Sequence, residues 1–213
     1  MNSGSRTLMI LFVLLSTALL HVTVFAQQPT AKTFFAIGVE EANKMEYSEA
    51  IDAFKHAITL KPDYAEAYFH LGSAYYSLHR YEEALDSYKK AVKADARYLD
   101  AYLSLGSLSS MLGEYDNAVK ALKTAVDINP QHAEAQFTLG NIYSEMEKYE
   151  EAVDAYKKAV KIKPDHAAAH YNLAVTYIKL NDKMISEARK EYMTLKKLDK
   201  ELAAELEEML KGK

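Results

Sequence analysis

Two histidines are the side chains whose spacing comes closest to a chemical site. His166 and His170 are four residues apart, so on a helix both imidazoles would lie on one face and could share a metal ion. A protein metal site needs three or four ligands, and no third ligand accompanies the pair. His170 also occupies a position where a repeated pattern places a large packing residue. We therefore expect no metal and no other cofactor.

Nucleophilic catalysis lacks its usual components. The chain has no cysteine, no Gly-x-Ser-x-Gly sequence and no glycine-rich phosphate loop. Four serines gather on one predicted helix, but no histidine stands near them in the sequence to activate a hydroxyl: Ser104, Ser107, Ser109 and Ser110. Small polar residues at a close approach of helices or of a ligand explain them better. We expect a protein that is not an enzyme.

Composition narrows the class of partner. The chain is 49% hydrophobic and 26% charged, which is typical of a folded protein with a packed core. Its formal net charge is -4, whereas nucleic-acid binding requires a face rich in lysine and arginine. Nucleic acid is therefore excluded as the expected partner.

The first residues have the pattern of an export signal. Arg6 precedes an apolar stretch from Leu8 to Leu20, and Val24 and Ala26 supply small or short-branched residues before a cut. We expect residues 1–26 to be a cleaved signal peptide, with 27–30 a short tail, and the mature chain to be periplasmic or extracellular. The alternative is an uncleaved membrane anchor formed by residues 8–25. Without cysteine, stability must come from packing rather than from disulfides.

An internal repeat governs the rest of the chain, with one pattern returning at a constant spacing. One position in the period holds glycine four times and then alanine: Gly38, Gly72, Gly106, Gly140 and Ala174. A second holds alanine, at Ala50, Ala84, Ala118 and Ala152, and a third holds a large residue, at Phe54, Tyr88, Leu122 and Tyr156. Pro62, Pro130 and Pro164 close three of the units. Such a period is typical of a solenoid.

These residues resemble the tetratricopeptide repeat family, whose pattern is a large residue, Leu-Gly, Tyr, Ala, an aromatic residue, Ala and Pro. The second unit shows it best: Tyr68, Leu71, Gly72, Tyr75, Ala84, Tyr88 and Ala91. The resemblance implies an all-α, right-handed α-solenoid of five helix-turn-helix repeats, 31–64, 65–98, 99–132, 133–166 and 167–200. Residues 201–213 are expected to form a capping helix.

The spacing of apolar residues supports two helices in each unit. Tyr68, Leu71 and Tyr75 lie on one helical stripe, and Ala84 and Tyr88 lie on another, with a turn near His79-Arg80 between them. A glycine inside a helix costs about 1 kcal/mol relative to alanine. We expect close approach of the partner helix, at its alanine, to compensate. The second unit has Ala96 in place of proline, which predicts a longer second helix.

The resemblance also implies a binding surface, because the first helix of each pair lines the concave side of such a solenoid. Beside the packing stripe, the period gives what we call the ladder: Phe35, Phe69, Leu103, Phe137 and Tyr171. His70, Ser73, Ser107, Asn141 and Asn172 complete the predicted groove. Apolar anchors separated by hydroxyl and amide groups suit a bound peptide. The alternative is that the ladder aromatics seal the joints between units.

The function that follows is a scaffold. We expect a non-catalytic adaptor of the cell envelope that binds a peptide or protein segment in its concave groove. The alternative is a self-associating structural element of an envelope complex, with a homo-oligomer as its product. The sequence identifies neither the partner nor the pathway.

Overall fold

The structure is a computed structural model that describes residues 29–180 and 182–212. All regular structure in these ranges is helical, so the predicted all-α class is confirmed. The eleven α-helices are α2 (Ala31–Asn43), α3 (Tyr47–Leu60), α4 (Ala65–Ser77), α5 (Tyr81–Ala94), α6 (Leu99–Met111), α7 (Tyr115–Ile128), α8 (Ala133–Glu145), α9 (Tyr149–Ile162), α10 (Ala167–Leu180), α11 (Ile185–Leu198) and α12 (Lys200–Lys211).

The predicted signal peptide and the alternative anchor fall on residues 1–26 and lie outside the described ranges. Among the described helices, none combines the length and the apolarity that crossing a membrane requires.

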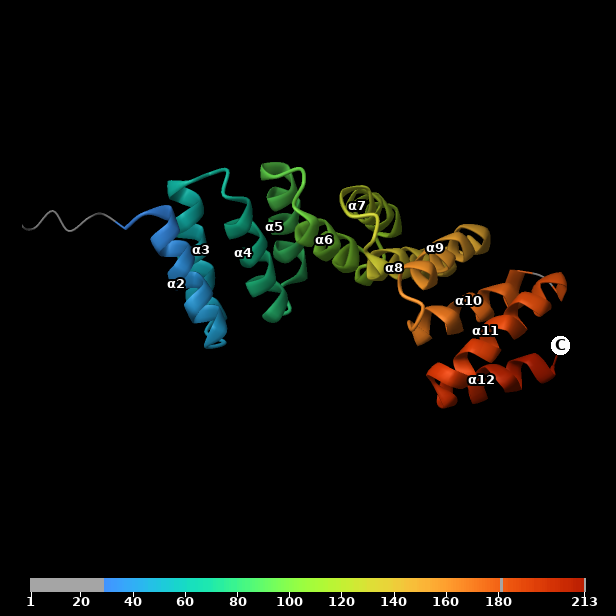
Figure 1. Cartoon of the computed structure of the whole chain (residues 1–213). Helices are drawn as coiled ribbons and strands as arrows, with labels where there is room; N and C mark the ends of the chain where they lie inside the picture. Colours follow the sequence, from blue (N-terminus) through green and yellow to red (C-terminus); the bar gives the residue numbers. More distant parts are fainter. Residues whose placement is uncertain (1–28, 181, 213) are drawn as a thin grey trace, which may run out of the picture.

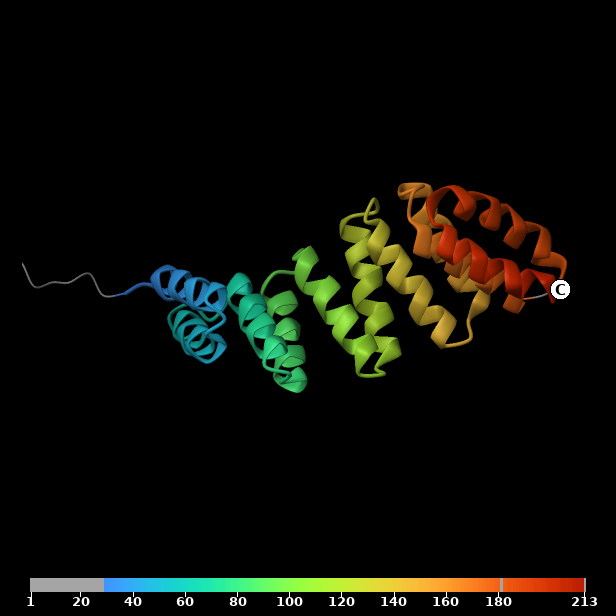
Figure 2. The same ribbon diagram turned by 90° about the horizontal axis from the view of Figure 1, so that it is seen from below.

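Consecutive helices form hairpins, and the hairpins stack in chain order into an elongated solenoid (Figures 1 and 2). Five pairs run from α2–α3 to α10–α11 in the described part of the chain, and each pair packs against the next. The turn inside each of the first four pairs contains one residue with a positive φ angle, for example His79 at 58° and Gly113 at 77°. A left-handed residue at this place ends the first helix and reverses the chain.

Glycine allows the two helices of a pair to approach closely. A Cβ added at Gly140 would lie 2.5 Å from Cδ1 of Tyr156, and one added at Gly38 would lie 2.6 Å from Cε1 of Phe54. The expectation that alanine forms this contact needs correction, because the nearest atoms belong to the large residue of the second helix. At Gly72 the backbone of the alanine position also comes close, with the Ala84 carbonyl oxygen 3.2 Å from the added Cβ.

The joint after the second unit forms without its proline. The prediction that this helix runs on through Ala96 is wrong, since α5 ends at Ala94. The Asp95 side chain accepts a hydrogen bond from the Arg97 backbone N–H at 2.8 Å, which closes a turn. Asn129 makes the same turn with Gln131 at the next joint. The same Asx turn thus follows a helix both where proline is present, at Pro130, and where Ala96 replaces it.

The last unit differs from the others and is covered by α12. A short 3-10 helix, Asp182–Met184, takes up the extra residues before α11. The helix α12 packs against both α10 and α11 and buries Ala203, Leu206 and Leu210. The C-terminal end of the core is therefore shielded from water, as a terminal repeat requires.

The curvature of the solenoid puts the first helices on its inner side. Neighbouring first helices contact one another at α2–α4, α6–α8 and α8–α10. No comparable contact joins the second helices of neighbouring pairs in the described part of the chain. Helices on the inside of a curve lie closer together than those on the outside.

We predict that Gly140→Ala destabilises the protein. The added methyl collides with the ring of Tyr156, which is 1% exposed, and we expect the free energy of unfolding to fall by about 2 kcal/mol. The matched control is Ala174→Gly at the same repeat position, which should cost only about 1 kcal/mol through helix propensity. Urea unfolding followed by circular dichroism measures both. A gain in stability from Gly140→Ala would contradict the close-approach argument.

A buried ion pair holds the last pair of helices to the preceding joint. His170 is 7% exposed, its Nδ1 lies 2.5 Å from Glu191 Oε2, and its Nε2 lies 3.0 Å from the Pro164 carbonyl oxygen. Both ring nitrogens face acceptors, so only the imidazolium satisfies both contacts. The hydrogen bond to Glu191 raises the pKa of His170, and burial opposes it. The side chain is thus a structural contact rather than a metal ligand.

We predict that this ion pair makes stability depend on pH. The folded chain holds the His170 proton more tightly than the unfolded chain, whose histidine pKa is near 6.5. The stabilisation is complete below that pH and is lost as pH rises through the higher folded pKa. Replacing His170 by tyrosine, the residue of the second and third units, should remove this loss. Melting temperatures of the two proteins from pH 5 to 9 measure it, and parallel curves would contradict it.

Candidate functional site

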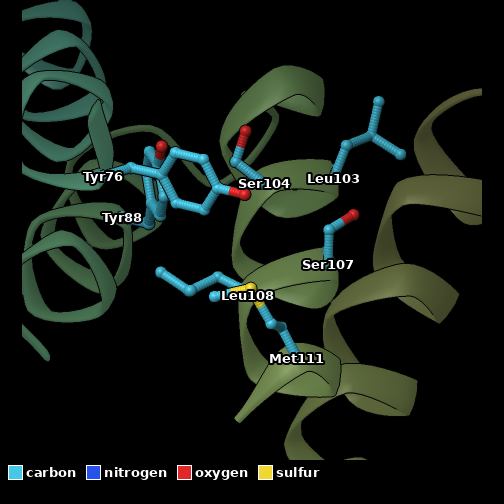
Figure 3. Close-up of a pocket in the computed structure, with 7 residues that line it drawn as sticks. All are labelled: Tyr76, Tyr88, Leu103, Ser104, Ser107, Leu108 and Met111. Carbon is cyan, nitrogen blue, oxygen red and sulfur yellow. The ribbon is translucent and has the colours of Figure 1, made fainter. Parts of the chain in front are cut away.

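The concave face carries two hollows, each at a joint between units. The first lies between the second and third units and has a volume of about 270 Å³. Figure 3 shows Tyr76 and Tyr88 on one side of it and residues of α6 on the other. Its lining is mostly apolar and consists of Tyr76, Tyr88, Leu103, Ser104, Ser107, Leu108 and Met111. The hollow lies at the joint between α4 and α6.

Two of its lining side chains are exposed apolar groups. Tyr76 is 44% exposed and Met111 is 50% exposed. The hydroxyl of the buried Tyr88 reaches the base of the hollow, where Ser73 Oγ lies 3.4 Å away. Burial raises the pKa of Tyr88, so the phenol stays protonated and can donate or accept a hydrogen bond. This hollow suits an apolar side chain with a polar neighbour.

The second hollow lies between the fourth and fifth units, has a volume of about 370 Å³ and is more polar. Asn141 Oδ1 accepts two hydrogen bonds, from the Tyr156 hydroxyl at 2.7 Å and from Asn172 Nδ2 at 2.8 Å. The amide nitrogen of Asn141 and the amide oxygen of Asn172 have no partner in the described part of the chain. One donor and one acceptor therefore remain available side by side, as a peptide backbone requires.

The two hollows are the same place in the repeat, separated by two periods. Tyr156 corresponds to Tyr88, Asn172 to Ser104, and Lys179 to Met111. Substitution at equivalent positions thus turns an apolar hollow into one lined by amides and charges. The remaining lining residues of the second are Asn141, Ser144, Glu145, Val175 and Thr176.

The ladder aromatics lie in the joints between units. The Phe35 ring is 5.1 Å from that of Tyr64, Phe69 is 5.2 Å from Tyr98, and Phe137 is 4.7 Å from His166. In each pair the second ring belongs to the residue that leads into the next unit, and the ladder side chain is half-buried. These contacts are the joint-sealing arrangement.

The other predicted groove residues divide between the two hollows and the joints. Leu103 and Ser107 line the first hollow, and Asn141 and Asn172 line the second. Ser73 donates to the Phe69 carbonyl oxygen at 3.1 Å and borders the first hollow through Tyr88.

His70 and Tyr171 are held by their surroundings. The His70 ring lies 5.2 Å from that of Phe35 and 5.7 Å from that of Phe54, and burial lowers its pKa, so the imidazole is neutral near pH 7. The Tyr171 hydroxyl donates to Glu205 of α12, which places it under the cap. Burial, followed by the interaction with Glu205, raises the pKa of Tyr171 to about 12.

Sequence reasoning missed the two tyrosines at the base of the hollows. The sequence predicts that Tyr88 and Tyr156 pack between paired helices, and they do so. Each also lines a hollow, and its hydroxyl contacts Ser73 or Asn141 beside it. The signal was present in the period. The same position holds Phe54 and Leu122 in the first and third units, so among the first four units a hydroxyl appears in the second and fourth.

The histidine pair does not form a metal site. Both ring nitrogens of His170 contact other residues, Glu191 and the Pro164 carbonyl oxygen. His166 Nε2 lies 3.3 Å from Glu134 Oε2, but the geometry is not that of a hydrogen bond. Within residues 29–180 and 182–212 no three histidine, aspartate or glutamate side chains are grouped to hold a metal.

We predict that Asn141 supports the second hollow energetically. Asn141→Leu removes the acceptor of both the Tyr156 hydroxyl and the Asn172 amide, and should lower the free energy of unfolding by about 2 kcal/mol. Ser73→Ala at the equivalent position loses a 3.4 Å contact with Tyr88 and a bond to the Phe69 carbonyl oxygen of its own helix, and should cost about 0.5 kcal/mol. Equal losses in urea unfolding would show that the amide network contributes nothing specific.

Comparison with solved structures places the fold among known repeat proteins. A crystal structure of MamA is 29% identical, with a TM-score of 0.72 over 84% of this chain and 92% of that one. YrrB, described as a TPR protein with an unusual peptide-binding site, is 25% identical, with a TM-score of 0.74 over 88% of this chain and 97% of that one. MamA from Desulfovibrio magneticus, at 22% identity and a TM-score of 0.71 over 80% of this chain and 96% of that one, shows the same fold.

A search of curated proteins found no match. Models of repeat families do match. A TPR repeat model matches residues 44–79, 111–147 and 140–181, and a tetratricopeptide repeat model matches residues 65–98. These matches cover both helices of several units, and the fold is that of a protein-interaction scaffold. The chain belongs to the tetratricopeptide repeat family.

Proposed function

We propose that the protein is a non-catalytic adaptor that binds an extended segment of a partner protein along its concave face. The observation that carries the proposal is the pair of equivalent hollows with different linings. The first offers the exposed apolar side chains of Tyr76 and Met111, and the second offers the unpaired amide groups of Asn141 and Asn172. A segment lying across both would place an apolar side chain in the first and polar backbone at the second.

Acidic residues at the edge of the same face favour a partner with basic side chains. Glu66, Asp100 and Glu134 stand in the first turns of α4, α6 and α8, and all three are exposed. Asp100 and Glu66 both influence the phenol of Tyr98. Burial is the main cause that raises the pKa of Tyr98 to about 12, and these two negative charges raise it further. Each carboxylate also complements the dipole of its helix, worth about 0.3 to 1 kcal/mol.

The location that we propose is the cell envelope. The support is the sequence pattern of residues 1–26, with a positive charge, an apolar stretch and a short side chain before the expected cut. In this proposal the mature chain begins at Gln27 and is periplasmic or extracellular. Retention of residues 8–25 as an anchor would keep the same solenoid at a membrane surface.

Self-association is the second candidate, and one observation favours it. At the N-terminal end of the solenoid, Ile37 on α2 is 41% exposed, whereas α12 covers the other end. An uncovered apolar end is a surface on which a second copy can stack. Molecular mass measured over a range of concentrations separates a stable monomer from this candidate.

We predict that removing the exposed apolar lining abolishes partner binding. The chain from Gln27 and a Tyr76→Ala, Met111→Ala variant would each be immobilised and used to capture proteins from an envelope extract. Because both side chains are largely exposed, the variant should keep its helicity while partners lose at least about tenfold in affinity, a typical effect of two anchor residues. The matched control is Met193→Ala, Leu198→Ala, which trims exposed residues of α11.

A partner lost from the groove variant alone supports the proposal. If the groove variant and the α11 variant retain the same partners, binding does not use the first hollow. If the chain captures only copies of itself, the self-association candidate replaces the adaptor.

A further inference from the structure

A third hollow lies on the outer side of the solenoid and results from one substitution within the period. The repeat position four residues before the glycine holds a ring in most units and an amide in the fourth: Phe34, Tyr68, Tyr102, Gln136 and His170. Glutamine lacks a ring, so it fills less of the space that the neighbouring side chains enclose.

The space left at Gln136 is open to solvent between the second helices α7 and α9, with α8 beneath them. Two adjoining pockets, each of about 380 Å³, share Val126, Gln136 and Lys158. One extends past Leu139 to Tyr143. The helix α8 packs against both α7 and α9, so the hollow has a helical wall on each side.

The equivalent place in the second unit is filled by a tyrosine of the chain itself. In the second unit, Lys90 is at the repeat position that Lys158 has in the fourth unit. The hydrogen bond to Asp86 is the main cause that raises the pKa of Lys90, and the nearby phenol of Tyr68 adds to it. By the period, Tyr68 and Lys90 hold in the second unit the positions that Gln136 and Lys158 hold in the fourth. Tyr102 likewise packs onto the core of the preceding units.

The Gln136 side chain lines the hollow without satisfying its polar groups. The residue is 5% exposed, and its amide makes no hydrogen bond to any residue that the structure describes. The amide atoms keep contact with solvent in the hollow, and a bound hydroxyl can replace that water as their hydrogen-bond partner. Val126 and Leu139 line the hollow beside it. The hollow thus combines apolar side chains with one amide that no described residue engages.

We propose that this hollow binds a tyrosine side chain carried by a protein partner. The ring takes the place that the rings of Tyr68 and Tyr102 occupy in earlier units, and the hydroxyl bonds to the Gln136 amide. The rim carries both signs of charge, with Lys123 and Lys158 beside Asp127, Glu151 and Asp154. A mixed rim suits a protein segment with both charges rather than a polymer of one sign. The site is separate from the concave face and does not depend on the proposed groove.

The first test uses p-cresol, the side-chain analogue of tyrosine, added to the intact ¹⁵N-labelled chain. We expect saturable amide shifts around Val126, Gln136 and Lys158, with p-cresol about fivefold tighter than toluene, the factor that one net hydrogen bond supplies. The variant Gln136→Tyr fills the hollow with the residue of the second and third units and should abolish these shifts. Gln136→Leu keeps the space without the amide and should remove the preference for p-cresol over toluene.

The second test uses a blocked Gly-Tyr-Gly peptide, with Gly-Phe-Gly as its control. Binding of the tyrosine peptide that Gln136→Tyr removes, and that Tyr76→Ala with Met111→Ala leaves unchanged, establishes the outer site independently of the groove. Circular dichroism and melting confirm that each variant is folded. Any of three results overturns the proposal: no saturable shifts near Gln136, equal affinity for p-cresol and toluene, or p-cresol binding without binding of the tyrosine peptide.

Discussion

The contact between a glycine of the first helix and a large side chain of the second is the constraint on which the architecture depends. At Gly38, Gly72, Gly106 and Gly140 the backbone lies against a large side chain so closely that a methyl group would overlap it. The large side chain fills the space between two helices and fixes their separation and rotation. Repeating one hairpin geometry in every unit generates a regular solenoid, and its curvature brings the first helices together on one side. The concave face is therefore a consequence of local packing inside each pair.

The candidate binding sites lie where the repeated backbone geometry is conserved between units but the side chain at a repeat position changes. Tyr88 and Tyr156 make the same helix contact as Phe54 and Leu122, and their hydroxyls then add polarity at the base of alternate joints. Gln136 stands where other units have a ring and lines a hollow on the outer side. In a repeat protein most substitutions of this kind change a surface without changing the fold, because each unit is supported on both sides by its neighbours.

The fold could be predicted from the sequence because its determinants recur at a fixed spacing. The period predicts the helix pairs, the turn at His79-Arg80 and the capping helix, and the structure confirms an all-α solenoid. The contacts between neighbouring units are harder to predict. They depend on the angle at which one unit packs on the next, and the sequence of a single unit does not determine that angle. The sequence left open whether the ladder aromatics bind a ligand or seal the joints, and their ring partners Tyr64, Tyr98 and His166 follow only from that angle. The end of α5 without a proline was missed because an Asx turn at Asp95 competes locally with helix continuation.

The fourth unit joins the two kinds of site. Its first helix, α8, presents Gln136 to the outer hollow and Asn141 to the second concave hollow. In a solenoid, a unit is stabilised mainly by its two neighbours, so a molecule bound at either joint of this unit stabilises the same stretch of chain against local unfolding. Both hollows contain a polar group of this one helix that makes no hydrogen bond within the described part of the chain, the Gln136 amide on the outer side and the Asn141 amide nitrogen on the concave side.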